Sequence, residues 1–124
     1  MPEQKKKILV VEDDKAVSQV MQLKLSRDGF EVEVAENGEI ALENLKNKKY
    51  DLILLDLIMP KVNGFELLKN LHELHSTTPK IVMSNLEQEE DIGKVKGLGA
   101  VELLPKFEMS LTGIADYVKN YLTR

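Results

Sequence analysis

The chain has 124 residues, enough to bury one hydrophobic core but too few for two independent domains, so we expect a single domain over residues 1–124. The net charge of −4 argues against direct binding of nucleic acid, and no apolar run is long enough to span a membrane. The absence of cysteine excludes a disulfide framework and a thiolate metal site, and it favours a cytoplasmic location.

Five segments have the length and composition of β-strands. Three are continuous apolar runs, and the second and fifth are weaker candidates. In chain order the five are Ile8–Val11, Phe30–Ala35, Leu52–Leu55, Ile81–Met83 and Ala100–Leu104. The lysines at positions 5 to 7 are interpreted as a solvated lead-in to the first strand, and not as a contact to nucleic acid.

A segment with helical periodicity follows each predicted strand. The first helix has Val17, Val20, Met21 and Leu25 on one face, with Gly29 as its end. The last has an apolar stripe of Leu111, Ile114, Ala115, Val118 and Leu122. The second and third helices depend on Ala41, Leu42 and Leu45, and on Leu67, Leu68, Leu71 and Leu74. The fourth, in the acidic stretch 87–99, is expected to be the least stable, because Gly93 costs roughly 1 kcal/mol of helix propensity.

Strand and helix alternate five times, which predicts an α/β fold with a parallel sheet covered by helices on both faces. In such sheets, ligands bind beyond the carboxyl ends of the strands. Polar residues follow four of the five strands. They are Glu12 and Asp13, Asp56, Ser84 and Lys106. The sequence therefore predicts one polar site at this edge of the sheet.

The chemistry of these residues indicates a hard cation. Carboxylates that lie close together in a partly desolvated crevice repel one another, so they must take up protons or bind a cation. Oxygen ligands without histidine or cysteine favour Mg²⁺, which commonly uses one or two carboxylates and a phosphoryl oxygen. A carboxylate beside Mg²⁺, a lysine and a hydroxyl is suited to attack phosphorus and become an aspartyl phosphate.

The chain resembles the receiver domains of two-component response regulators. The resemblance covers "ILVVEDD", "DLILLDLIMPKVNGFELL", "KIVMSN" and "GAVELLPKF", in that order. It implies a doubly wound, flavodoxin-like sheet of five parallel strands in the order 2-1-3-4-5, with five helices. It also implies that Asp56 is the phosphoacceptor, that Glu12 and Asp13 hold Mg²⁺ together with Asp56, that Ser84 is the switch hydroxyl, and that Lys106 is the ion-pairing lysine.

The sequence departs from the usual receiver pattern near its end. The lysine usually precedes a proline in a cis bond, whereas Pro105 precedes Lys106 here. Leu103 stands where the family usually has an aromatic residue that moves together with the switch hydroxyl. Asn85, beside Ser84, is bulkier than the small residue common at that place. We therefore expect activation to be weaker or to pass through the acidic fourth helix.

The resemblance implies a signalling function. A histidine kinase or a phosphotransfer protein would donate the phosphoryl group to Asp56, and a downstream protein or an output domain would respond. Self-dephosphorylation is expected, but turnover of an external substrate is not, because aspartate phosphohydrolases place a second acid two residues after the first, where this chain has Ile58. Two copies could pair through the last helices.

Two alternatives to this function differ in how well the residues support them. A flavin- or nucleotide-binding domain is disfavoured, because no glycine-rich loop follows the first strand. A pseudo-receiver that binds partners without phosphorylation remains an alternative. The altered lysine loop is the feature that favours it.

Three further residues are interpreted structurally. Asp14 is predicted to cap the first helix and not to ligate the metal directly. His72 and His75 lie near the end of a predicted helix without acidic partners, so we expect them to be exposed to solvent.

Overall fold

The structure is a computed structural model that describes residues 5–59, 62–74, 77–84, 89–106 and 108–124. Twelve elements are found in these ranges. In chain order they are β1 (Lys7–Val11), α1 (Lys15–Arg27), β2 (Glu31–Ala35), α2 (Gly38–Asn47), β3 (Leu52–Leu55), β4 (Ile58–Met59), β5 (Val62–Asn63), α3 (Gly64–Leu74), β6 (Lys80–Met83), α4 (Glu89–Gly97), β7 (Ala100–Leu104) and α5 (Leu111–Leu122).

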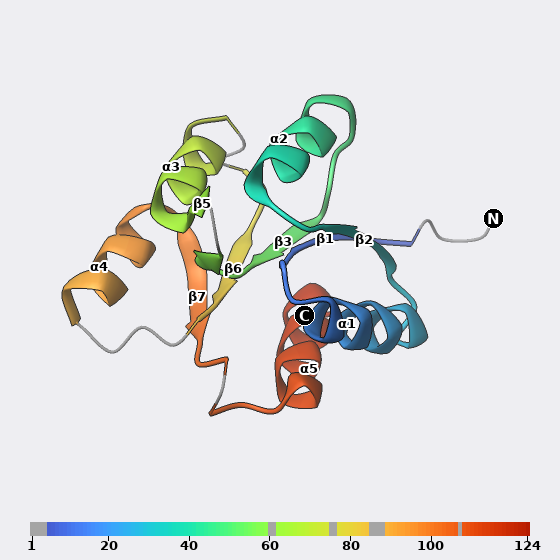
Figure 1. Cartoon of the computed structure of the whole chain (residues 1–124). Coiled ribbons are helices and arrows are strands. Elements are labelled where there is room, and N and C mark those ends of the chain that lie inside the picture. Colours follow the sequence, from blue (N-terminus) through green and yellow to red (C-terminus); the bar gives the residue numbers. More distant parts are fainter. Residues whose placement is uncertain (1–4, 60–61, 75–76, 85–88, 107) are drawn as a thin grey trace.

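Five strands form one parallel sheet in the order β2-β1-β3-β6-β7 (Figure 1). This confirms the predicted doubly wound α/β fold. The central strands β3 and β6 are buried at every position, because helices cover both faces of the sheet. The edge strands β2 and β7 are only partly buried, which explains why their apolar patterns were the weaker ones.

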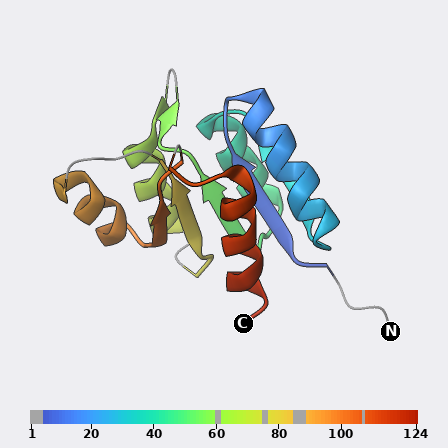
Figure 2. The ribbon, with the colours of Figure 1, turned by 90° about the horizontal axis from the view of Figure 1, so that it is seen from below.

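Two hydrophobic clusters lie on opposite faces of the sheet. One joins the sheet to α1 and α5 through residues such as Met21, Leu25 and Ile114. The other joins it to α2, α3 and α4 through Leu45, Leu71 and Val95, among others. Figure 2 views the molecule from the side of α1 and α5, which lie in front of the sheet. The predicted apolar stripes of both helices therefore face the core.

Local signals define the ends of α1. The Asp14 side chain accepts hydrogen bonds from the backbone N–H groups of Ala16 at 2.9 Å and Val17 at 3.3 Å, which confirms it as the N-cap. The helix ends before Gly29, whose φ of 97° is the left-handed conformation that favours glycine. The cap directs the chain from the end of β1 into the helix.

A short hairpin between β3 and α3 was not anticipated. The strands β4 and β5 pair antiparallel, with Ile58 opposite Asn63 and Met59 opposite Val62. Two-residue strands are too short to produce a periodic pattern in the sequence. The hairpin follows directly from the loop that contains Asp56.

The acidic fourth helix is shorter than the stretch assigned to it. It runs over Glu89–Gly97, with Val95 buried and Ile92 partly buried. Residues 87–88 of the predicted stretch lie outside the described residues. None of the helices in the described ranges is long and apolar enough to cross a bilayer.

The two predicted surface histidines differ in what the structure describes. His72 is exposed, as expected, but its imidazole ring also lies against the backbone of Gly99. A Cβ atom at Gly99, which has a φ of +93°, would lie 2.4 Å from His72 Nδ1. This contact joins α3 to the turn before β7. His75 lies outside the described residues.

Candidate functional site

Three predicted site residues lie one position beyond the end of a strand. The backbone N–H of Glu12 donates to Ala35 O at 3.0 Å, that of Asp56 to Val11 O at 3.0 Å, and that of Ser84 to Leu104 O at 2.9 Å. These bonds extend the parallel ladder by one residue on each strand. The sheet itself therefore fixes the backbone from which each side chain enters the site.

Lys106 joins the two buried carboxylates. Its ammonium group donates to Asp56 Oδ2 at 2.7 Å and also contacts Glu12 Oε1. The Lys106 side chain is 11% exposed, and its contacts span 50 and 94 residues of sequence. Within the described residues, which exclude Phe107, no cis peptide bond is found, and Lys106 reaches both acids despite the reversed Pro105–Lys106 order.

The carboxylates are held in an unfavourable environment for negative charge. Glu12 is 1% exposed and Asp56 is 3% exposed. Burial, together with the neighbouring Asp56, raises the pKa of Glu12 to about 7, although the hydrogen bond from Lys106 opposes this shift. Burial lowers the pKa of Lys106, but its contacts to Asp56 and Glu12 outweigh burial and raise it. The single positive charge of Lys106 therefore only partly compensates the negative charge of Glu12 and Asp56.

The site has the donor set for a divalent cation. Glu12, Asp13 and Asp56 each offer one carboxylate oxygen, and these oxygens lie within 4.8 Å of one another. Asp13 is exposed, whereas Glu12 Oε2 is buried and has no hydrogen-bond partner among the described residues. A buried carboxylate oxygen without a donor is unfavourable unless a cation is bound beside it. All the ligands are oxygens, which suits Mg²⁺.

Ser84 places a second unsatisfied group at the site. Ser84 is 2% exposed, and its Oγ has no hydrogen-bond partner in the described part of the chain. A hydroxyl in this state is available to donate to an incoming oxygen anion. The neighbouring Asn85 lies outside the described residues.

A cavity beside Ser84 was not anticipated. It has a volume of about 210 Å³ and is lined by Ser84, Ile92, Lys96, Glu102, Leu103 and Pro105. The Leu103 side chain is only half-buried and packs against the cluster below α4. Nothing in the sequence indicated open space here, because it depends on how α4 packs against β7.

Comparison with known proteins agrees with this geometry. Residues 8–116 match the family model of the response regulator receiver domain. The chain is 44% identical over 102 residues to a CpxR homologue of Haemophilus influenzae, a transcriptional regulatory protein, covering 81% of this chain and 43% of that protein. It is 38% identical over 103 residues to the Bacillus subtilis alkaline phosphatase synthesis regulator PhoP, covering 82% and 42%. The chain thus spans less than half the length of these relatives.

Solved structures show the same fold. A CheY-like receiver domain protein from Methanospirillum hungatei superposes with a TM-score of 0.88 at 28% identity, covering 97% of this chain and 95% of that one. The Vibrio cholerae chemotaxis protein CheY4 superposes with a TM-score of 0.85 at 26% identity, covering 94% and 98%. The chain therefore belongs to the response regulator receiver domains of two-component systems.

Proposed function

We propose that this chain is a single receiver domain over residues 1–124 that accepts a phosphoryl group on Asp56. The observation that supports this most strongly is the convergence of Glu12, Asp13, Asp56 and Lys106 at one sheet edge. A structural ion pair would need one acid and one lysine. Three carboxylates around one lysine leave excess negative charge, which is disfavoured unless a carboxylate takes up a proton or the site binds a cation.

Each residue has a defined task in the proposed transfer. An Asp56 carboxylate oxygen forms a bond to phosphorus while the bond from phosphorus to the imidazole nitrogen of a phosphohistidine breaks. The electron pair leaves with the imidazole, which then takes up a proton. Lys106 lies within hydrogen-bond distance of Asp56 and neutralises charge on the transferred group, and the Ser84 hydroxyl donates to one of its oxygens.

Mg²⁺ would be held by Glu12, Asp13 and Asp56. When bound, it supplies positive charge that stabilises the transferred phosphoryl oxygens. The buried Glu12 Oε2 supports this assignment, because this oxygen has no other partner among the described residues. Lys106 keeps Asp56 in place before the donor arrives.

The proposed donor is a histidine kinase or a phosphotransfer protein, and the proposed target is a downstream protein or an output domain. The names of the relatives, which are transcriptional regulatory proteins, point to transcription as the process controlled. We further propose a cytoplasmic protein that dephosphorylates itself and turns over no external substrate. In such a receiver, the added charge on Asp56 changes the surface that the partner binds.

Phosphorylation by a small donor tests this function. Wild type incubated with Mg²⁺ and acetyl phosphate should gain the mass of one phosphoryl group, and Asp56→Asn should gain none. Asp14→Asn is the matched control, because asparagine also caps a helix and Asp14 lies outside the carboxylate cluster.

The possible outcomes separate the two functions. Equal modification of wild type and Asp56→Asn would place the phosphoryl group on another residue. No modification of the folded wild type, by acetyl phosphate or by a panel of phosphorylated kinases, would favour the pseudo-receiver that binds partners without phosphorylation.

A further inference from the structure

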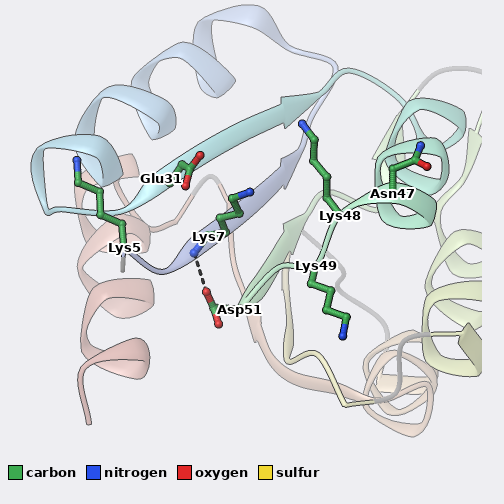
Figure 3. A pocket seen from close by; sticks show the side chains of 7 residues that line it. All are labelled: Lys5, Lys7, Glu31, Asn47, Lys48, Lys49 and Asp51. Carbon is green, nitrogen blue, oxygen red and sulfur yellow. Dashed lines mark hydrogen bonds between the residues drawn. The ribbon is translucent and has the colours of Figure 1, made fainter. Parts of the chain in front are cut away.

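A second polar cleft lies at the sheet edge opposite Asp56. It has a volume of about 670 Å³ and opens beside the amino-terminal ends of β1, β2 and β3 (Figure 3). Four of its lining residues are lysines, namely Lys5, Lys7, Lys48 and Lys49. A concentration of positive charge is unexpected in a chain whose net charge is −4.

The sheet brings these lysines together from two distant segments. Lys5 and Lys7 lie at the start of β1, and Lys48 and Lys49 lie in the loop that precedes β3. The parallel pairing of β1 with β3 places Ile8 opposite Leu52, so the two basic segments enter the sheet side by side. From the sequence, residues 5–7 were predicted to be a solvated lead-in to the first strand. That prediction did not include the second basic segment, Lys48 and Lys49.

Hydrogen bonds fix the frame of the cleft. Asp51 Oδ2 accepts from the backbone N–H of Lys7 at 2.7 Å (Figure 3). The Asp51 N–H donates to Lys7 O at 2.8 Å. Glu33 accepts from Lys48 Nζ at 2.5 Å and from the Tyr50 hydroxyl at 2.9 Å. These contacts tie the loop before β3 to β1 and β2, so the cleft is formed before any ligand arrives.

The remaining lysines keep their charge available. Lys48 is paired with Glu33, but within the described ranges no hydrogen bond or ion pair is found for the ammonium groups of Lys5, Lys7 and Lys49. Figure 3 shows these three ammonium groups on different sides of the cleft. One phosphate group could therefore not contact all of them.

We propose that this cleft binds a small molecule with two or more linked phosphates, of the size of a nucleoside di- or triphosphate. The cleft volume lies within the usual range of small-molecule sites. Lysine ammonium groups bind phosphates as point charges. The carboxylates of Glu31 and Asp51 lie among the lysines, where they could accept hydrogen bonds from the hydroxyl or amino groups of a nucleoside.

Calorimetric titration of the full chain with ATP tests the proposal. A buffer with EDTA and without divalent ions prevents metal-mediated binding of the nucleotide at the Asp56 edge. ATP and pyrophosphate should bind, inorganic phosphate should bind more weakly, and adenosine should not bind. The Asp56→Asn variant should bind ATP as the wild type does, because the cleft lies at the other edge of the sheet.

Two charge-matched variants separate a built site from general attraction. Lys5→Gln/Lys7→Gln/Lys49→Gln should weaken ATP binding by about tenfold or more. Lys15→Gln/Lys24→Gln/Lys69→Gln removes the same charge outside the cleft and should leave the affinity within about twofold.

Three results would overturn the proposal. These are an equal loss of ATP affinity in the two triple variants, equal affinity for ATP and adenosine, and a higher affinity for a single-stranded RNA than for ATP. The last result would identify a nucleic-acid surface in place of a nucleotide site.

Discussion

Replacing Asp13 by asparagine should raise the stability of the metal-free protein and reduce its response to Mg²⁺. Asp13 is the exposed member of the carboxylate cluster, so the substitution removes one charge without opening the core. It also leaves the contacts of Lys106 to Glu12 and Asp56 in place. The two effects have opposite signs, which makes the prediction specific to a shared cation site.

The size of the first effect follows from the distance between the charges. At 4.8 Å, the upper limit of the separations among these oxygens, two unit charges repel by about 0.9 kcal/mol in water and by about 3.5 kcal/mol at an effective dielectric constant of 20. Because water screens the exposed Asp13, we expect Asp13→Asn to gain about 1 kcal/mol in free energy of unfolding without metal.

The second effect follows from linkage between binding and folding. Mg²⁺ at 100 times its dissociation constant stabilises the wild type by about 2.7 kcal/mol. A tenfold loss of affinity would leave Asp13→Asn with a gain of about 1.4 kcal/mol at the same concentration.

Urea unfolding in EDTA and in Mg²⁺ measures both effects. Asp14→Asn serves as the control, since it removes the neighbouring charge and keeps a capping side chain. If the free energy of unfolding of Asp13→Asn matched that of the wild type in both buffers, or if Mg²⁺ stabilised the variant as much as the wild type, Asp13 would not belong to the metal site.

Three further predictions concern the buried charges and the contact between α3 and β7. Lys106→Gln leaves Glu12 and Asp56 without their lysine and should cost roughly 3 kcal/mol in EDTA, and Mg²⁺ should restore part of this loss in the same unfolding assay. The pKa of Glu12 is raised from 4.5 to about 7, so between these pH values the folded protein holds a proton that the unfolded chain has released. The free energy of unfolding of the metal-free protein should therefore fall as pH rises through this range, by at most roughly 3 kcal/mol. Glu12→Gln should remove this slope, and a slope unchanged in that variant would exclude Glu12 as its source. Gly99→Ala should lower the free energy of unfolding by about 2 kcal/mol, because the new Cβ meets the imidazole of His72 and alanine is strained at a positive φ. If the His72→Ala/Gly99→Ala double variant recovered none of this stability, backbone strain alone would be responsible.

The sequence by itself was sufficient to predict the sheet and its helices. Continuous apolar runs are typical of strands covered on both faces, and β3 was predicted at Leu52–Leu55, where the structure has it. The weaker patterns of β2 and β7 reflect their positions at the two edges of the sheet. The cap by Asp14 was also predictable, because it depends on backbone groups only two and three residues away.

The order of the five sheet strands, β2-β1-β3-β6-β7, was expected from the family resemblance. Together with the parallel direction of the strands, it explains why the acids meet. A residue that follows a parallel strand must lie at the carboxyl edge, so Glu12 and Asp56 could be placed together before any coordinates were known. The same reasoning gave no distances and no hydrogen-bond partners.

Only the tertiary structure decided how the charges pair. The contacts of Lys106 span 50 and 94 residues, and its double contact to Glu12 and Asp56 depends on side-chain conformations that local patterns do not determine. The burial that raises the pKa of Glu12, the cavity beside Leu103 and the lysine cleft around Lys7 likewise arise from packing between separate elements. Periodicity reports which face of an element is apolar, whereas shape and electrostatics at a site depend on the neighbours that the fold brings to it.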